Sequence, residues 1–311
     1  MFDITLDVLI ALGGILAILV VASAVTFALR TNLTTAVHRE LTQRIQSWWT
    51  MVVIFTVAIA VSDTVSLVFF ALVSFLALKE YLSLVPTRRV DRRVIFWAYL
   101  AIPLQYVLIG YEWYGMFIIL IPVYAFLLLP MRMVVAGETA NFLRAMGTLH
   151  WGLMAMVFSI SHVAYLLVLP DQVNAGTGSA GLVLFLVFLT QFNDVSQYLW
   201  GKLLGRHTVV PTVSPSKTVE GLIGGLLTTT MLGFVLGPWL TPLDQIQSLI
   251  AGLIIGAAGF VGDVVISALK RDLDVKDSGS LLPGHGGVLD RVDSLIYTAP
   301  LFFHYIYYLH Y

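Results

Sequence analysis

The chain has 311 residues, of which 59% are hydrophobic and 11% are charged, and its mean hydropathy is +0.90. This composition excludes a water-soluble globular protein and indicates an integral membrane protein, because most of the chain falls into apolar runs of about 20 residues, the length that crosses a bilayer. The net charge of −1 says little about partners, and the absence of cysteine excludes disulfides, thiolate metal sites and cysteine nucleophiles.

The apolar runs are continuous, which predicts an all-α polytopic bundle of transmembrane helices and not a barrel of short alternating strands. About ten spans are expected, at residues 7–29, 46–62, 64–85, 94–110, 113–130, 149–169, 181–201, 219–240, 247–268 and 292–309. The first lacks a small-residue cleavage pattern after a basic start, so we interpret it as a retained span. The chain is then a single membrane domain, 1–311, with N-terminal helices in 1–180 and catalytic helices and loops in 181–311.

The basic residues predict the orientation of these spans. All 17 lysines and arginines fall on one side of the ten-span arrangement or at its edge. The turns on the other side, at residues 62–64, 110–112, 170–180 and 241–245, contain neither lysine nor arginine. The positive-inside rule therefore places the basic loops in the cytoplasm and both termini outside, with a bacterial inner membrane as the expected location.

Two predicted spans contain a carboxylate within an apolar run. Asp194 follows Asn193 in the seventh span, and Asp263 lies in the ninth. An ionisable group within a span usually faces a cavity or a partner, although either Asp could instead be neutral or hydrogen-bonded to a Ser or Thr of another helix. Asp263 is close enough to the cytoplasmic end to meet Asp290, and two such carboxylates are suitable ligands for Mg²⁺.

The segment 201–221, GKLLGRHTVVPTVSPSKTVEG, contains a phosphate-binding candidate. Ser214, Lys217 and Thr218 lead into a predicted helix, whose free backbone N–H groups favour anions. The structural alternative is a Ser/Thr helix cap with Glu220 downstream. Further basic residues of this segment strengthen the functional interpretation, and they are Lys202, Arg206 and His207.

The most charged stretch is SALKRDLDVKDSGSLLPGHGGVLDRVD, residues 267–293. Lys270, Arg271, Lys276 and Arg291 are cations of the kind that hold phosphate oxygens, and Asp290 and Asp293 are hard ligands of the kind that hold Mg²⁺. Gly286 and Gly287 follow His285 and let the backbone approach a ligand closely. His285 fits a phosphate hydrogen-bond donor at least as well as a metal ligand. A solvated loop is the alternative, but the order of PGHGG and DRVD favours a metal–nucleotide phosphate site.

Residues 267–293 resemble the signature of the phosphatidate cytidylyltransferases (CDP-diacylglycerol synthases) in order and spacing. The likeness continues upstream through Asp194, the sequence SPSKTVEG and Gly262-Asp263, and it is weaker in the N-terminal half. The resemblance implies transfer of a cytidylyl group from CTP to phosphatidic acid, giving CDP-diacylglycerol and pyrophosphate at the cytoplasmic face of a membrane. It also implies Mg²⁺ as cofactor and a homodimer, with no nucleic-acid partner.

The resemblance implies roles for individual residues as well. Asp263 and Asp290 would be the metal-binding carboxylates, with Asp293 as a further candidate if a second metal binds. The phosphate-holding groups would be Lys217, Lys270, Arg271, Lys276 and Arg291. The chain departs from the family at Ile266, where the family usually carries Glu, which suggests a divergent paralogue.

Two other functions remain open at this stage. The lipid acceptor could be a polyprenyl or ether-lipid phosphate. An ion-coupled transporter using Asp194 and Asp263 is a further alternative, but it predicts inverted repeats that the sequence lacks, and it leaves PGHGG and DRVD without a reason. Glu80 and Glu112, near predicted helix ends, are interpreted as interfacial or structural residues.

Overall fold

The protein is described by a computed structural model that covers residues 5–31, 34–88, 91–135, 137, 139–174, 176–279 and 286–311. Within these ranges the regular secondary structure is helical except for one two-stranded antiparallel hairpin, which confirms the predicted all-α bundle. The N-terminal half contains α1 (Leu6–Ala28), η1 (Leu29–Thr31), α2 (Thr35–Val61), α3 (Asp63–Leu84), α4 (Arg92–Gly110), α5 (Tyr114–Ile119), η3 (Leu120–Ala125), α6 (Phe126–Val135), α7 (Phe142–Gly152), η4 (Leu153–Ser159), α8 (Ile160–Leu166) and η5 (Asp171–Asn174). The C-terminal half contains α9 (Gly178–Leu204), β1 (Thr208–Val210), β2 (Ser214–Thr218), α10 (Val219–Leu240), α11 (Gln245–Asp272), α12 (Leu289–Val292) and α13 (Leu295–His310).

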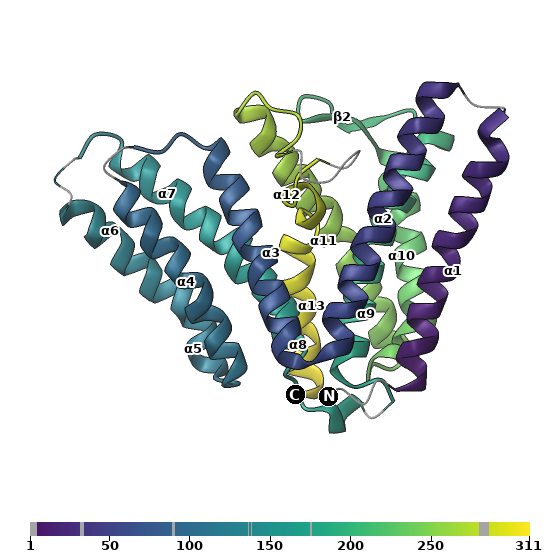
Figure 1. The fold of residues 1–311 in the computed structure, drawn as a ribbon, viewed down its shortest axis with the longest axis horizontal. Helices are drawn as coiled ribbons and strands as arrows, with labels where there is room; N and C mark the ends of the chain where they lie inside the picture. Colours follow the sequence, from purple (N-terminus) through teal and green to yellow (C-terminus); the bar gives the residue numbers. More distant parts are fainter. Residues whose placement is uncertain are drawn as a thin grey trace.

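Nine helical segments of the described chain are long and apolar enough to cross a membrane. They begin with Leu6–Thr31 and end with Gln245–Asp272, and together they correspond to the first nine predicted spans. The tenth predicted span corresponds to α13, which has 16 residues and is shorter than these nine. Figure 1 shows α13 inside the bundle, and its C-terminal end lies at the same end of the molecule as the beginning of α1.

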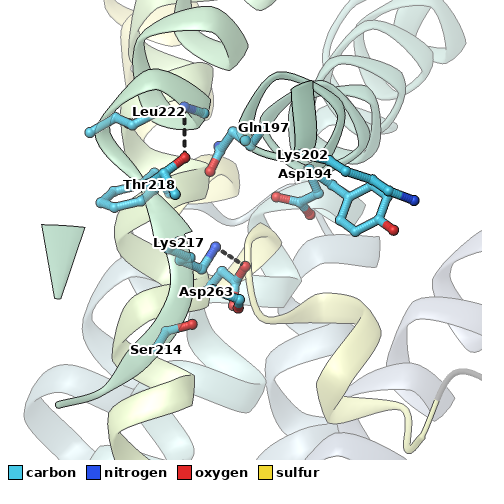
Figure 2. Close-up of a pocket in the computed structure, with 13 residues that line it drawn as sticks. Asp194, Gln197, Lys202, Ser214, Lys217, Thr218, Leu222 and Asp263 are labelled. Carbon is cyan, nitrogen blue, oxygen red and sulfur yellow. Dashed lines mark hydrogen bonds and ion pairs between the residues drawn. The ribbon is translucent and has the colours of Figure 1, made fainter. Parts of the chain in front are cut away.

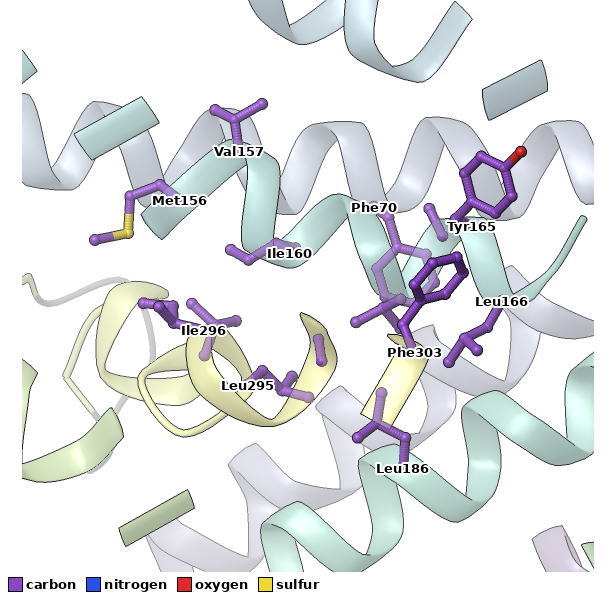
Figure 3. Close-up of a cluster of buried hydrophobic side chains, with 14 of the residues drawn as sticks. Phe70, Met156, Val157, Ile160, Tyr165, Leu166, Leu186, Leu295, Ile296 and Phe303 are labelled. Carbon is purple, nitrogen blue, oxygen red and sulfur yellow. The ribbon is translucent and has the colours of Figure 1, made fainter. Parts of the chain in front are cut away.

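The hydrophobic core lies where the two halves of the chain meet. Figure 3 shows apolar side chains of α3, η4, α8, α9 and α13 packed together, among them Phe70, Ile160, Leu186 and Phe303. In the span Phe142–Leu166, 72% of the most apolar window is buried, compared with 17% in the span that contains α1. Segment 142–166 is therefore central in the bundle, whereas α1 exposes most of its apolar surface, as a lipid-facing helix does.

Glycines let α9, α10 and α11 pack closely. A Cβ atom at Gly233 of α10 would lie 2.8 Å from the Cα atom of Gly252 in α11. A Cβ atom at Gly252 would in turn lie 2.9 Å from the carbonyl oxygen of Thr229. Small residues at these contacts bring helix backbones together, as is usual between membrane helices. The three helices thereby pack closely, and two of them carry Asp194 and Asp263.

The β-hairpin joins α9 to α10 at the end of the bundle where the basic loops lie (Figure 1). Thr208 pairs with Thr218, and Val210 pairs with Ser214. Thr218 then caps α10, because its Oγ1 accepts the backbone N–H of Gly221 at 3.1 Å. The predicted Ser/Thr cap is therefore present, and the extended segment before it holds Lys217 beside α11.

Candidate active site

A cavity of about 370 Å³ opens among α9, β2, α10 and α11. This volume lies within the range of about 300–1,000 Å³ that is usual for small-molecule sites. The structure brings five of the predicted site residues into its wall, as Figure 2 shows, and these are Asp194, Ser214, Lys217, Thr218 and Asp263. The remaining lining residues are Gln197, Tyr198, Gly201, Lys202, Ser216, Gly221, Leu222 and Phe260.

Lys217 and Asp263 form an ion pair at this cavity (Figure 2). The Lys217 side chain is 16% exposed and the Asp263 side chain 26% exposed, so the pair is accessible from the cavity but largely withdrawn from bulk water. The Ser267 hydroxyl donates to the other Asp263 oxygen at 3.3 Å. β2 thus places a cation, and α11 a carboxylate, on the same cavity wall.

Asp194 connects three helices at the cavity. The Ser294 hydroxyl lies 3.1 Å from each of the two Asp194 carboxylate oxygens and 3.1 Å from the carbonyl oxygen of Gly259. The two interpretations that the sequence left open for Asp194 are therefore both present, since it faces a cavity and binds a serine of another helix. Next to it, Asp293 accepts the backbone N–H of Ser294 at 2.8 Å.

Asp290 is held by four donors on the other side of Lys270. Its Oδ1 accepts from the Lys270 ammonium at 2.8 Å. Its Oδ2 accepts from the backbone N–H of Ser278 at 2.8 Å, the Ser278 hydroxyl at 3.0 Å and the backbone N–H of Gly287 at 2.9 Å. Burial raises the pKa of Asp290, but Lys270 and the backbone N–H groups of Gly287 and Ser278 outweigh this effect and hold the pKa below its ordinary value.

The glycines of the signature approach carboxylates of the protein itself. Gly286 has a φ of 77°, and a Cβ atom there would collide with Asp290. A Cβ atom at Gly287 would collide with Glu80 and Ser278. These glycines were expected to let the backbone approach a ligand closely, whereas in the structure they let it fit against Asp290 and Glu80.

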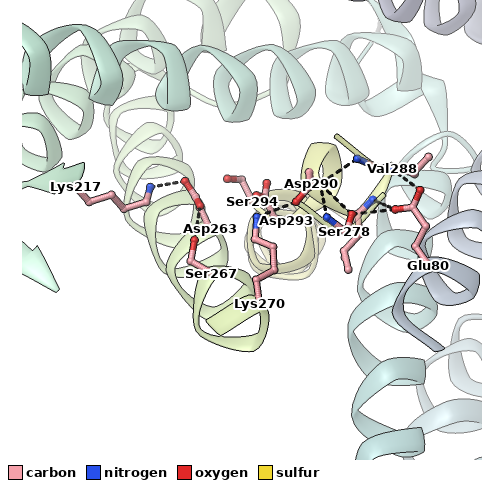
Figure 4. A network of polar contacts seen from close by, with 12 residues as sticks. Glu80, Lys217, Asp263, Ser267, Lys270, Ser278, Val288, Asp290, Asp293 and Ser294 are labelled. Atoms are coloured by element: carbon pink, nitrogen blue, oxygen red, sulfur yellow. Dashed lines mark hydrogen bonds and ion pairs between the residues drawn. The ribbon is translucent and has the colours of Figure 1, made fainter. Parts of the chain in front are cut away.

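The charged groups form a row across the end of α11. Figure 4 shows Lys217, Asp263, Asp293, Lys270, Asp290 and Glu80 following one another between β2 and α3. Two lysines and four carboxylates thus lie close together in an otherwise apolar bundle (Figure 4). Buried charges of this kind require partners, and the two lysine–carboxylate pairs supply them.

Other predicted residues lie outside the cavity wall. Arg271 donates from Nε to the carbonyl oxygen of Val213 at 3.1 Å and so ties α11 to the hairpin. Lys276 is exposed, and the Nε atom of Arg291 is buried without a hydrogen-bond partner among the described residues. His285 lies outside the described residues. Ile266, where the family resemblance led us to expect Glu, is fully buried in the hydrophobic core.

The expected anion site at the start of α10 is largely filled by the protein itself. The backbone N–H of Val219 donates to the carbonyl oxygen of His207 at 2.8 Å, and that of Gly221 donates to Thr218. The cations at this end of the cavity are therefore the side chains of Lys217 and Lys202.

Sequence reasoning assigned no role to three residues on one face of α9. Gln197, Tyr198 and Gly201 line the cavity together with Asp194. Positions 194, 197, 198 and 201 are spaced i, i+3, i+4 and i+7, which places them on one face of a helix. The spacing was therefore a usable signal once Asp194 had been singled out.

The fit of a metal ion depends on Asp263. Within the described ranges, no group of three or more His, Asp or Glu side chains is arranged to hold a metal ion. Asp263 and Asp290, the predicted pair of ligands, each bind a different lysine. The donor chemistry at Asp263 nevertheless suits Mg²⁺, because its partly exposed carboxylate lies at the cavity wall and the Ser267 hydroxyl is hydrogen-bonded to it.

Comparisons with known proteins place most of the chain in one family. A family model described as "Cytidylyltransferase family" matches residues 42–309, so α1 lies outside the match. The chain is 48% identical over 298 residues to uncharacterized protein YnbB of Escherichia coli (strain K12), covering 96% of this chain and 98% of that protein.

Two relatives named phosphatidate cytidylyltransferase match over shorter regions. The protein of Synechocystis sp. is 46% identical over 115 residues, covering 36% of this chain and 39% of the relative. The protein of Staphylococcus epidermidis is 37% identical over 153 residues, covering 46% of this chain and 59% of the relative. These two alignments therefore span less than two thirds of the relatives' lengths.

Proposed function

Because the chain belongs to the cytidylyltransferase family, we propose that it transfers the cytidylyl group of CTP to phosphatidic acid, giving CDP-diacylglycerol and pyrophosphate. The observation that carries the proposal is the cavity in the membrane-embedded helices, whose wall combines Lys217, Lys202 and Asp263. A nucleotide and a lipid phosphate can meet only at such a place, where a polar cavity opens within helices that contact lipid.

The chemistry demands positioning more than proton transfer. In the proposed step, an oxygen of the lipid phosphate attacks the α-phosphorus of CTP, and the bond to the β-phosphate breaks to release pyrophosphate. The attacking oxygen is already anionic, so no general base is required. The protein must instead align two anions and neutralise the charge that develops on the leaving group.

The residues of the cavity divide this task. Lys217 and Lys202 attract the phosphates of the nucleotide. Lys270 lies about two helical turns from Asp263 on α11 and belongs to the same row of charges (Figure 4). When bound, Mg²⁺ would neutralise phosphate oxygens as a Lewis acid, and Asp263 is the residue that would hold it, with Asp290 and Asp293 as further candidates. Lys217 would then exchange Asp263 for a phosphate group as its partner.

The cavity also has an apolar wall. Tyr198, Leu222 and Phe260 lie in its lining, and Tyr198 is 59% exposed. This wall supports lateral entry of a lipid whose acyl chains stay in the bilayer while its headgroup reaches the lysines. The basic helix ends on this side of the bundle favour a cytoplasmic orientation, which is where CTP is available.

The decisive experiment measures lipid-dependent formation of CDP-diacylglycerol and pyrophosphate by the purified protein in detergent with CTP and Mg²⁺. We expect turnover with phosphatidic acid, loss of activity on chelation and its recovery when Mg²⁺ is restored. Lys217→Met should lower activity by about a hundredfold or more, since it removes a charged contact to phosphate. Lys79→Met, which removes an exposed lysine of α3, is the matched control and should retain activity.

The acceptor is tested in the same assay. Polyprenyl phosphate and ether-lipid phosphate replace phosphatidic acid in parallel reactions. Turnover with one of these and not with phosphatidic acid would show that the acceptor is assigned wrongly. Folded protein that releases no pyrophosphate with any lipid phosphate would refute the proposed reaction.

A further inference from the structure

Glu80 reaches the signature loop from the opposite half of the chain. It lies near the end of α3, and its Oε1 accepts the backbone N–H of Val288 at 2.9 Å. Its Oε2 accepts the backbone N–H of Leu289 at 2.9 Å and the Ser278 hydroxyl at 3.1 Å (Figure 4). One carboxylate therefore binds both Ser278 and the start of α12 (Leu289–Val292), which flank the glycines of the signature in the sequence.

These bonds hold a short helix in place. α12 contains only four residues, and the N–H groups of Val288 and Leu289 stand at its start. Gly287 permits the close approach, because any side chain there would occupy the position of the Glu80 carboxylate. A carboxylate at the start of a helix is also favoured electrostatically. Glu80 thus acts as a cap that is supplied by a distant helix.

The contact continues into the row of charges. The Ser278 hydroxyl lies 3.1 Å from Glu80 and 3.0 Å from Asp290, so a single O–H group serves two carboxylates. Asp290 in turn binds Lys270 at 2.8 Å. Within the described residues, Glu80 has backbone N–H and hydroxyl donors and no salt bridge. Its charge is therefore used to order the loop and not to balance a neighbouring cation.

We propose that Glu80 is a positioning residue for cytidylyl transfer. By fixing Val288 and Leu289 on one side and Ser278 on the other, it sets the position of Asp290 and, through Asp290, of Lys270. This proposal rests on the proposed function and extends it, since it makes the site composite: helices of both halves of the chain are required. From the sequence alone, Glu80 is predicted only to be interfacial or structural.

The test combines hydrogen exchange with kinetics of the full-length protein. Glu80→Gln keeps the size of the side chain but directs an NH₂ group at one of the backbone donors. We expect amide exchange at Val288 and Leu289 to rise by about tenfold or more, which corresponds to the loss of a hydrogen bond to a charged group. We also expect kcat per folded molecule to fall by about tenfold or more, with the KM for CTP changed by less than about threefold.

A double-substitution experiment separates positioning from general stability. If Glu80 acts through Ser278, Glu80→Gln should have a much smaller effect on kcat in a Ser278→Ala background than in the wild type. Asp171→Asn is the matched control, because Asp171 also accepts a backbone N–H, that of Ser179 at 2.7 Å, but in the connection between α8 and α9. It should leave kcat within about twofold of the wild type.

The outcomes distinguish this proposal from the proposed function. Unchanged exchange at Val288 and Leu289 in Glu80→Gln would overturn the positioning role whether or not the protein turns over CTP. A loss of total activity that equals the loss of folded protein, with kcat per folded molecule unchanged, would also overturn it. Increased exchange at these amides in a protein that lacks cytidylyltransferase activity would refute the reaction while supporting the contact.

Discussion

The Lys270–Asp290 pair should be energetically coupled to an extent that a surface ion pair is not. Its atoms lie 2.8 Å apart, and the side chains are 14% and 5% exposed. Removing one partner of a buried pair costs about 3–5 kcal/mol, whereas exposed pairs contribute about 0–1 kcal/mol. Since Lys270 keeps some contact with water, we expect Asp290→Asn to destabilise the protein by about 3 kcal/mol.

A double-mutant cycle isolates the pair from the other contacts of Asp290. Lys270→Met removes the cation without adding a donor, and Asp290→Asn in that background no longer leaves a buried charge without its partner. The expected coupling energy is about 2 kcal/mol, within the range measured for contacting residues. Reversible unfolding of the purified protein in mixed detergent micelles gives the free energy of each variant.

The control for this cycle is an exposed lysine of the same region. Lys202→Met combined with Asp290→Asn should be additive to within about 0.5 kcal/mol, since Lys202 does not contact Asp290. Equal additivity for Lys270→Met and Asp290→Asn would refute the reasoning, because it would mean that the two charges do not stabilise each other in the folded protein.

Three further outcomes follow from the fold. Gly252→Leu should destabilise the protein by about 1–3 kcal/mol or more, because backbone atoms of α10 lie 2.9 Å from the new Cβ position; Gly13→Leu, where nothing lies within 4 Å, should be nearly neutral in the same unfolding measurement. Asn193→Leu should cost about 1 kcal/mol, because it removes two buried hydrogen bonds between α9 and its neighbours, and unfolding that matches the wild type would contradict this account. The chain has no cysteine, so single cysteines can report sidedness: Gln172→Cys should react with an impermeant maleimide in intact cells, and Thr212→Cys only after permeabilisation. The reverse labelling pattern would overturn the orientation inferred from the basic loops.

The signature loop illustrates how far local sequence reasoning reaches. Its charges and glycines indicate a polar site. The same sequence, however, is compatible with a backbone that surrounds a ligand and with a backbone that surrounds carboxylates of the protein itself. The structure shows the second arrangement at Gly286 and Gly287, where Asp290 and Glu80 occupy the space that side chains would need. Glu80 lies about two hundred positions away in the sequence, so no local pattern could connect it with the loop.

The spans follow from the sequence itself, which also predicts their sidedness and the general location of the polar site. The transfer of an apolar run into a bilayer depends on that run alone, and the distribution of lysine and arginine is read directly from the loops. The partners of the charged residues were decided only by the tertiary structure, which pairs Lys217 with Asp263 and Lys270 with Asp290. Electrostatic and hydrogen-bond energies depend on distances of a few ångströms between helices, and those distances follow from how α3, α9, α10 and α11 pack.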